Sequence, residues 1–158
     1  MANAVINPYE IFLGNKGYLK INEIEIAELK SLEITSSPDT KEIGLMNSPT
    51  KGEVNVAFKG TIKFEINKIY SRFKPAIIEA QKKVKPFVFN LEATVYTPDG
   101  EGEESISISN CWLKGDINLF KLNADNDFLS ESYEAGFSIE NFSFTELVDD
   151  GEEWSSIY

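Results

Sequence analysis

Few residues of this chain are suited to chemistry. The sequence has no histidine and one cysteine, Cys111, so the commonest general base and the usual ligand sets for zinc or copper are missing. Cys111 has no obvious partner to activate its thiol, and it falls at an alternating position of an expected strand, where burial is favoured. One cysteine also forms no internal disulfide. We therefore predict no catalytic residue, no metal site and no cofactor.

The remaining candidates for a ligand site are acidic or glycine-rich. Asp99, Glu101, Glu103 and Glu104 follow the turn signal at Pro98 and could hold calcium weakly, but their spacing is not that of an EF-hand loop, and a solvated acidic turn is favoured. The turn sequence at 14–17 is too short for a phosphate-binding loop. A carboxylate pair for glycoside cleavage would depend on spatial neighbours that a sequence does not show. The sequence thus favours a protein that is not an enzyme.

The positions of the acidic residues indicate a chain with two electrical halves. The 158 residues carry a net charge of −11, which argues against nucleic-acid recognition because such binding uses Lys and Arg on phosphates. Residues 41–85 contain 10 basic and 4 acidic side chains, whereas residues 98–158 contain 2 basic and 15 acidic ones. Complementary patches of this kind would let copies meet head to tail. Acidic segments that only maintain solubility are the alternative.

Period-two alternation predicts several strands. The longest alternation covers 54–67, and it exceeds the usual strand of about 5–6 residues. Further strands are expected at 87–95 and, after the turn at 97–100, at 105–112, where the even-numbered residues share one face. The segments 18–26 and 29–34 are also β-rich, and residues 133–144 change parity after Glu140-Asn141, where we expect a bend. The even-numbered side of 54–67 is apolar and the odd-numbered side is largely polar: Val54, Val56, Phe58, Ile62, Phe64 and Ile66 against Asn55, Lys59, Thr61, Lys63 and Glu65.

The spacing changes to three and four residues near 69–84, which predicts one amphipathic helix. Ser71 is a plausible N-cap, Pro75 suits the first turn, and Pro86 ends the element. Lysines near 82–85 match the negative end of the helix dipole. We expect this helix to plug one edge or end of the sheet.

The segment 36–52 is long for a simple connection, since hairpin loops usually take about 2–5 residues. It begins and ends with turn residues, yet its centre is apolar, so we expect a long loop. Two interpretations stay open: the loop folds back on its own core, or it is an arm that packs on a neighbouring subunit. The candidate residues of such an inter-subunit arm are Asp39, Lys41, Glu42, Ile43, Leu45 and Met46.

Taken together, these elements predict a single mainly β domain over 1–158, with one flanking helix and an acidic C-terminal tail at 148–158. The N-terminus has no basic region followed by an apolar run, and no segment approaches the roughly 20 apolar residues of a membrane helix. We therefore expect no signal peptide and no membrane partner.

The order of these features resembles the phage tail tube proteins of defective-prophage type that accompany contractile sheaths. The resemblance runs through a glycine, short hairpin and strand at 17–30, the segment Glu42-Ile-Gly-Leu-Met46, the strand 58–64, the helix opening at 71–73 and the aromatic-acidic strand 137–146. One departure is Asn47-Ser48-Pro49, where relatives tend to have a glycine and basic residues. The resemblance covers nearly the whole chain.

That family implies a β-sandwich or partial barrel whose copies form rings of six stacked into a hollow tube. The implied partners are the subunit itself, a tail sheath protein, a tape-measure protein and a baseplate initiator, with DNA only as non-specific passing cargo. The implied location is the bacterial host cytoplasm before assembly and then the virion or tail-like particle. In such a tube we expect the odd-numbered side of the long strand to line the lumen, with ordinary solvent exposure as the alternative. The lumen candidates are Asn55, Lys59, Thr61, Lys63 and Glu65.

Two other functions stay open on the sequence alone. One is the tube of a headless tail-like bacteriocin or of a secretion device, and the other is a monomeric β-sandwich that binds a ligand through the segment 36–52.

Overall fold

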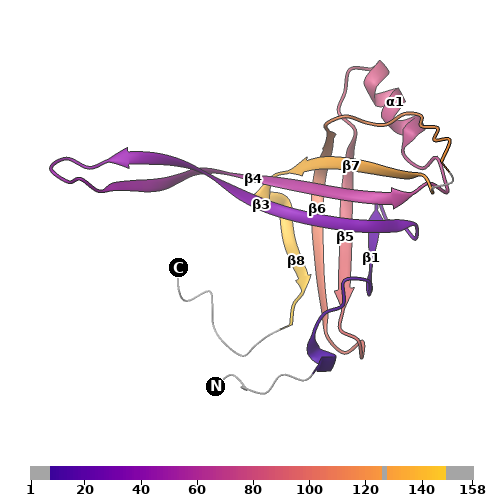
Figure 1. Ribbon diagram of the computed structural model, residues 1–158, viewed down its shortest axis with the longest axis horizontal. Coiled ribbons are helices and arrows are strands. Elements are labelled where there is room, and N and C mark those ends of the chain that lie inside the picture. Colours follow the sequence, from indigo (N-terminus) through magenta and orange to yellow (C-terminus); the bar gives the residue numbers. More distant parts are fainter. Residues whose placement is uncertain (1–7, 126–127, 149–158) are drawn as a thin grey trace.

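The computed structural model describes residues 8–125 and 128–148. The acidic tail expected at 148–158 lies outside the described residues, apart from Val148. These described residues form one eight-stranded antiparallel sheet, one α-helix and two short 3-10 helices (Figure 1). The elements are η1 Pro8–Glu10, β1 Gly17–Ile21, β2 Ile24–Glu25, β3 Leu29–Gly44, β4 Lys51–Asn67, α1 Lys74–Lys82, β5 Val88–Tyr96, β6 Glu103–Lys114, β7 Ser130–Phe137, η2 Ile139–Asn141 and β8 Phe142–Glu146.

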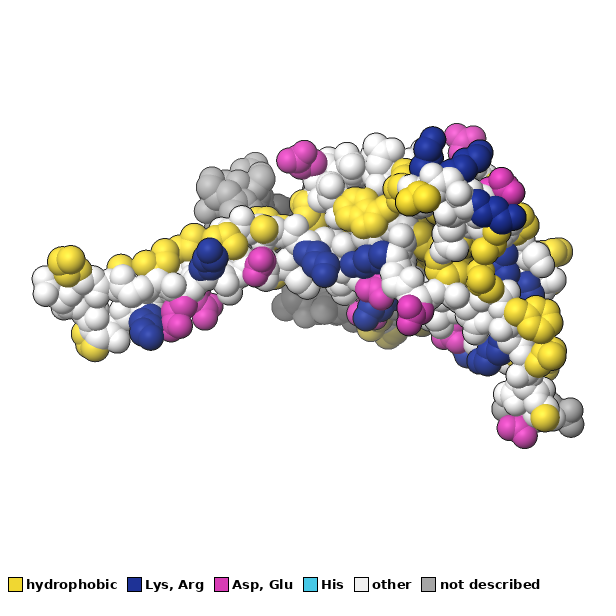
Figure 2. Space-filling view, turned by 90° about the horizontal axis from the view of Figure 1, so that it is seen from above, with side chains coloured by type: hydrophobic (Ala, Val, Ile, Leu, Met, Phe, Trp, Pro, Cys, Tyr) yellow, Lys and Arg dark blue, Asp and Glu magenta, His cyan; other side chains and the backbone are white. Residues whose placement is uncertain are grey.

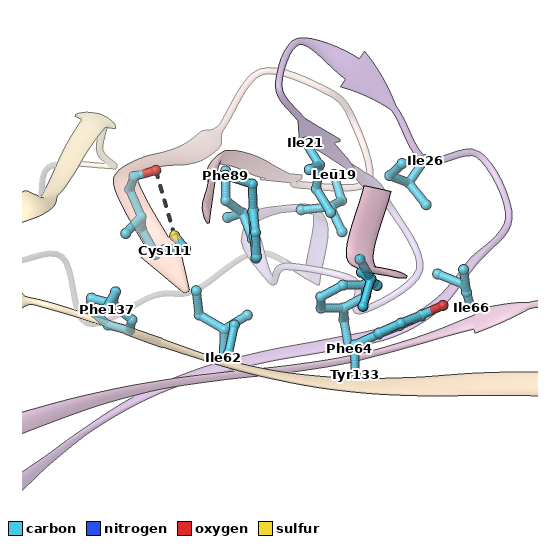
Figure 3. Close-up of a cluster of buried hydrophobic side chains, with 14 residues drawn as sticks. Leu19, Ile21, Ile26, Ile62, Phe64, Ile66, Phe89, Cys111, Tyr133 and Phe137 are labelled. Atoms are coloured by element: carbon cyan, nitrogen blue, oxygen red, sulfur yellow. Dashed lines mark hydrogen bonds between the residues drawn. The ribbon is translucent and has the colours of Figure 1, made fainter. Parts of the chain in front are cut away.

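The sheet folds over itself into two layers. Its strand order is β2-β1-β5-β6-β7-β4-β3, with β8 paired to β6 beside this path. In Figure 1 the strands β7, β4 and β3 cross over β6, β5 and β1. The core lies between the layers, where Ile62, Phe64 and Tyr133 of one layer face Leu19 and Phe89 of the other (Figure 3). The mainly β fold with one helix is therefore confirmed.

A bulge in β6 changes which side chains reach the core. Asn110 adopts φ +53°, and the pairing of β5 with β6 shifts register between Phe89 and Leu91. As a result Ile108 and Cys111 are both fully buried, whereas Trp112 is 37% exposed. The expectation that Asn110 and Trp112 share the face of Ile108 is wrong, because one extra residue in a strand reverses the alternation after it.

The predicted bend near 140 is confirmed, and it is sharper than a bulge. β7 ends at Phe137, the 3-10 turn η2 follows, and β8 then pairs with β6 through Ile106–Phe144 and Ile108–Phe142. The ring of Phe142 stacks on that of Phe137, with 5.9 Å between centroids. One edge of β6 therefore pairs with β8 at 105–108 and with β7 at 112–114. Through β7 the sheet continues into its second layer.

The segment 36–52 is not a long loop. Residues as far as Gly44 continue β3, and β4 begins at Lys51, so the connection shrinks to 45–50. Pro38 and Asp39 looked like turn residues, but β3 is an edge strand, where a proline loses no ladder hydrogen bond. A register shift between Asp39 and Thr40 absorbs the irregularity. The result is a long β-hairpin that projects from the body (Figure 1).

The helix α1 is shorter than the predicted 69–84. It begins at Lys74 with Phe73 as N-cap, and no side chain caps it. Ser71 instead accepts a hydrogen bond from Lys68 Nζ at 3.3 Å. Pro75 lies in the first turn of the helix and has no backbone N–H that would need a capping partner. At the other end Val84 takes φ +54° and closes the helix.

The helix does plug one end of the two-layered sheet, as predicted. Ile77 is 1% exposed, and Phe73 packs edge-on against Phe64 and Tyr133, with centroid separations of 6.2 and 5.6 Å. Burying side chains of this size contributes about 1.5–3 kcal/mol each. A small void of about 10 Å³ remains among these rings.

Two buried carboxylates fix the helix and the segment before it. The Glu28 side chain is 1% exposed and accepts hydrogen bonds from Nε and Nη2 of Arg72, the latter at 3.0 Å. Glu131 accepts from Lys74 Nζ at 2.6 Å and from the Tyr133 hydroxyl at 2.6 Å. The pairs with Arg72 and Lys74 join distant parts of the sequence, so they set where the α1 region sits on the sheet.

The Glu28–Arg72 pair gives a stability prediction. Replacing Arg72→Ala leaves a buried carboxylate without its cation, and we expect a loss of about 3 kcal/mol in the free energy of unfolding measured with urea. The matched control is Lys30→Ala, which removes the exposed pair to Glu65 and should cost about 0.5 kcal/mol or less. Equal losses in the two variants would contradict the role of the buried pair.

Glu131 predicts how stability depends on pH. Burial raises the pKa of Glu131, but the hydrogen bonds from Lys74 and Tyr133 and the charge of Lys68 outweigh burial and hold the pKa below its ordinary value of 4.5. A depressed pKa adds stability above the unfolded value, and that stability is lost as pH falls through the folded value. Urea unfolding between about pH 6 and pH 3 should therefore show a steeper loss for the native chain than for Glu131→Gln. Parallel curves would contradict this assignment.

Candidate functional site

The hairpin of β3 and β4 extends beyond the body as a two-stranded arm, residues 38–58. Its strands pair from Pro38–Phe58 to Gly44–Lys51, and in Figure 1 the arm projects away from α1 and from the layer of β1, β5 and β6. At the tip Asn47 has φ +60°, and the Thr50 amide donates to Ser48 Oγ at 3.2 Å. The tip is thus an ordered turn.

One face of the arm is apolar and exposed. The period-two alternation of β4 continues from the body into the arm, but the opposing layer ends, so the apolar side meets solvent there. A row of hydrophobic side chains is visible along the arm in Figure 2. Six apolar side chains of the arm are between 43% and 91% exposed: Ile43, Leu45, Met46, Val54, Val56 and Phe58.

The structure places all six predicted arm residues in this hairpin, and all are exposed. Lys41 pairs across the strands with Val54, while Glu42 pairs with Glu53 and lies 4.0 Å from Lys51 Nζ. Sequence reasoning missed Val54, Val56 and Phe58 as arm residues, because their alternation looks the same whether or not a second layer covers it. The structure shows that these three residues belong to the arm, because this part of β4 pairs with β3 beyond the end of the second layer.

The opposite side of β4 is part of a polar face in the body. Three rows of cross-strand neighbours run over β3, β4 and β7 on the side away from the core. Lys63 stands between Glu33 and Glu134 in one row. We define the polar face as Ser31, Glu33, Thr35, Thr61, Lys63, Glu65, Ser132 and Glu134.

The lumen candidates divide between two parts of the molecule. Thr61, Lys63 and Glu65 lie on the polar face, whereas Asn55 lies on the arm and Lys59 at its base. Sequence reasoning missed Glu33 and Glu134, which come from other strands. In the sequence, Glu33 and Glu134 are marked only by their place in the alternation of polar and apolar residues at 29–34 and 130–137.

The polar face contains Lys63 and three glutamates, Glu33, Glu65 and Glu134, and two of these glutamates have a lysine beside them. Glu65 has a pKa below its ordinary value, first because Ser130 donates a hydrogen bond to it and also because Lys30 lies 3.5 Å away. Lys114 Nζ lies 3.8 Å from Glu134. Lys63, together with the neighbouring Lys30 and Lys114, therefore offsets the three glutamates of this face.

The described residues offer little to chemistry. Cys111 is fully buried with its Sγ 3.8 Å from the Ile108 carbonyl oxygen, and burial raises the pKa of the thiol to about 11 (Figure 3). Within 8–125 and 128–148, no three His, Cys, Asp or Glu side chains are placed to hold a metal ion. None of the helices in the part of the chain described is long and apolar enough to cross a membrane.

The sheet, helix and arm described above belong to a known protein family. The family model of phage tail tube proteins matches residues 4–146. The chain belongs to the phage tail tube protein family. This is a family of structural proteins and not of enzymes. No curated protein sequence matches the chain.

Solved structures show the same fold at low sequence identity. This tail tube protein is similar to a chain of the tube-terminating cap of the anti-feeding prophage, with a TM-score of 0.62 at 10% identity over 92% of this chain and 94% of that one. It is also similar to a chain of the extended sheath-tube complex of an extracellular contractile injection system, PVC, with a TM-score of 0.59 at 9% identity over 84% and 89%. A chain of the anti-feeding prophage baseplate gives 0.56 at 12% identity over 93% and 99%.

The buried thiol of this tail tube protein gives a prediction of low reactivity. Because the thiolate is the reactive species and burial raises the pKa of Cys111, labelling by a disulfide reagent at pH 8 should be slower than in denaturant by at least about a hundredfold. The labelling rate is measured by absorbance, with urea-unfolded protein as the control. Native labelling at the unfolded rate would show that Cys111 is accessible.

Proposed function

We propose that this tail tube protein is the repeating subunit of a phage-type tail tube, in which six copies form a ring and rings stack into a hollow conduit inside a contractile sheath. The observation that carries the proposal is the arm. It exposes an apolar face that projects beyond its own body, so a neighbouring subunit is needed to cover it.

The size of the exposed apolar surface supports assembly. Phe58 is 60% exposed and Met46 is 91% exposed, and both belong to one continuous hairpin. Covering a side chain of this kind contributes about 1.5–3 kcal/mol when it becomes fully buried. Contiguous apolar patches on a protein surface typically mark a protein interface. The arm residues are therefore assigned to contacts between subunits.

The polar face is assigned to the lumen wall. It carries hydroxyl and charged side chains on three adjacent strands, and the rows around Lys63 keep opposite charges next to each other. A wall of this kind offers neither an apolar patch nor a large field of one sign to a passing molecule. The assigned cargo is a tape-measure protein, with DNA only as non-specific cargo.

The remaining partners belong to the same assembly. A tail sheath protein would surround the tube and a baseplate initiator would start it, and the likeness to chains of a sheath-tube complex and of a baseplate supports both. Subunits would assemble in the bacterial host and end in the virion or tail-like particle. The tube of a contractile injection system is the second candidate, and the likeness to chains of the anti-feeding prophage and of PVC supports it. A monomeric binding module leaves the apolar arm unexplained.

Deleting part of the arm tests this function. Removal of residues 39–50 should abolish ring and tube formation seen by electron microscopy, because it removes the tip and half of the exposed apolar face. The body should still fold with its thermal midpoint within a few degrees of the native chain, since the core residues of β4 begin only after Gly60. Unchanged assembly would contradict the role of the arm.

A matched pair of substitutions separates the apolar face from the arm as a whole. Val56→Asp places a charge on the apolar face, whereas Asn55→Asp places the same charge on its polar neighbour. We expect the first to raise the concentration needed for assembly by at least about tenfold, equal to about 1.4 kcal/mol, and the second to change it little. Equal effects would mean that charge alone, and not apolar contact, governs assembly.

A further inference from the structure

The body carries opposite charges at the two ends of its β5–β6 hairpin. The function proposed for the arm involves neither of these ends. β5 starts close after α1 and runs to the turn at 97–102, from which β6 returns (Figure 1). We define the basic end as Lys82, Lys83, Val84 and Lys85. The acidic end is Asp99, Glu101, Glu103 and Glu104 together with Leu147 and Val148.

The cations of the basic end are unpaired. Lys82, Lys83 and Lys85 are exposed, and within the described residues their side chains form no ion pair or hydrogen bond. Glu79, one turn earlier on α1, is the acidic residue of this helix. Figure 2 shows Lys and Arg side chains gathered over this end of the molecule. Val84 lies among the lysines and is 92% exposed, so an apolar side chain stands at the centre of the charges.

The acidic end has a matching composition. Side chains of Glu101 and Glu104 make no ion pair in the part of the chain that the structure describes, and Lys16 donates to the Pro98 carbonyl oxygen at 2.6 Å rather than to a carboxylate. Within the described residues, Glu101 is therefore exposed and Glu104 half-buried without an ion pair, whereas the charge of Lys16 acts on Asp99.

Apolar side chains lie beside these carboxylates as well. Val148 packs against Gly102, 3.5 Å from the point where a Cβ would stand. Val148 and Leu147 nevertheless remain 54% and 62% exposed. The acidic end thus combines charge with exposed apolar surface, as the basic end does.

The two ends of one molecule are too far apart to neutralise each other. The nine residues of β5 span about 30 Å at about 3.3 Å per residue. Exposed charges are screened beyond about 8 Å at physiological ionic strength. Each end thus keeps its charge available for a second molecule.

We propose that the acidic end of one copy docks on the basic end of a second copy. Val84 meets Leu147 and Val148 at the centre of the contact, and the lysines face the glutamates around it. An apolar centre with a charged rim is the usual anatomy of a protein interface. Because the two surfaces differ, the contact is head to tail and repeats from copy to copy. It contains no arm residue, so it is a separate contact from the one proposed for the arm.

Charge reversal in the full-length chain tests the contact. One variant, Glu101→Lys with Glu104→Lys, has two basic ends, and the other, Lys82→Glu with Lys83→Glu, has two acidic ends. Sedimentation velocity at low salt should show at least about tenfold weaker self-association for each variant alone. An equimolar mixture should recover association, because the basic ends of one variant then face the acidic ends of the other.

The control variant is Glu25→Lys with Glu140→Lys, which makes the same change in net charge as the first variant at exposed positions that belong to neither end. It should associate as the native chain does. A mixture that fails to recover, or a control as weak as the first variant, would overturn the proposal. If the basic end instead binds another acidic partner, such as a phosphate-bearing polymer, the mixture would likewise not recover self-association.

Disulfide trapping gives an answer that does not depend on affinity. Glu101→Cys and Lys83→Cys are made as separate full-length variants and oxidised together. Cys111 is buried and should stay silent. We expect a disulfide-linked heterodimer in several-fold excess over either homodimer. Homodimers in equal yield, or tubes that form while no heterodimer is trapped, would sink the head-to-tail contact and leave the arm function untouched.

Discussion

The pairing of β3 with β4 is the interaction on which the rest of the structure depends. It builds one wall of the core in the body and continues as the arm. Along β4 the same side of the strand is buried from Gly60 onward and exposed before it. Body and arm are therefore one secondary-structure element in two environments, and the apolar face of the arm is the core face without its opposing layer.

Gly60 stands where the environment changes. It pairs with Phe137, the last residue of β7, and the Phe137 ring lies so close that a Cβ on Gly60 would stand 2.6 Å from it. Real Cβ contacts do not reach such distances, so a side chain at position 60 would displace the Phe137 ring where β7 ends beside β4. The position where β7 ends decides how much of β4 becomes arm.

Charge has two different tasks in this molecule. Inside, Glu28 and Glu131 are satisfied by cations from residues far away in sequence, and these pairs hold α1 and its approach on the end of the sheet. Outside, Glu65 and Glu134 of the polar face have lysine partners on neighbouring strands, whereas the lysines at 82–85 have no ion pair within the described residues. Paired charges suit a wall, and unpaired charges suit a contact with another molecule.

The sequence by itself determined the mainly β class, the single helix with Pro75 in its first turn, and the polar and apolar sides of β4, since these depend on local periodicity and backbone preference. It did not reveal that 36–44 is strand, because a proline on an edge strand and a proline in a loop look alike in one dimension. Nor did it reveal the parity change at Asn110, which depends on how β6 meets β5. Only the tertiary structure decided which apolar residues are core and which are arm, because burial depends on where the opposing layer ends.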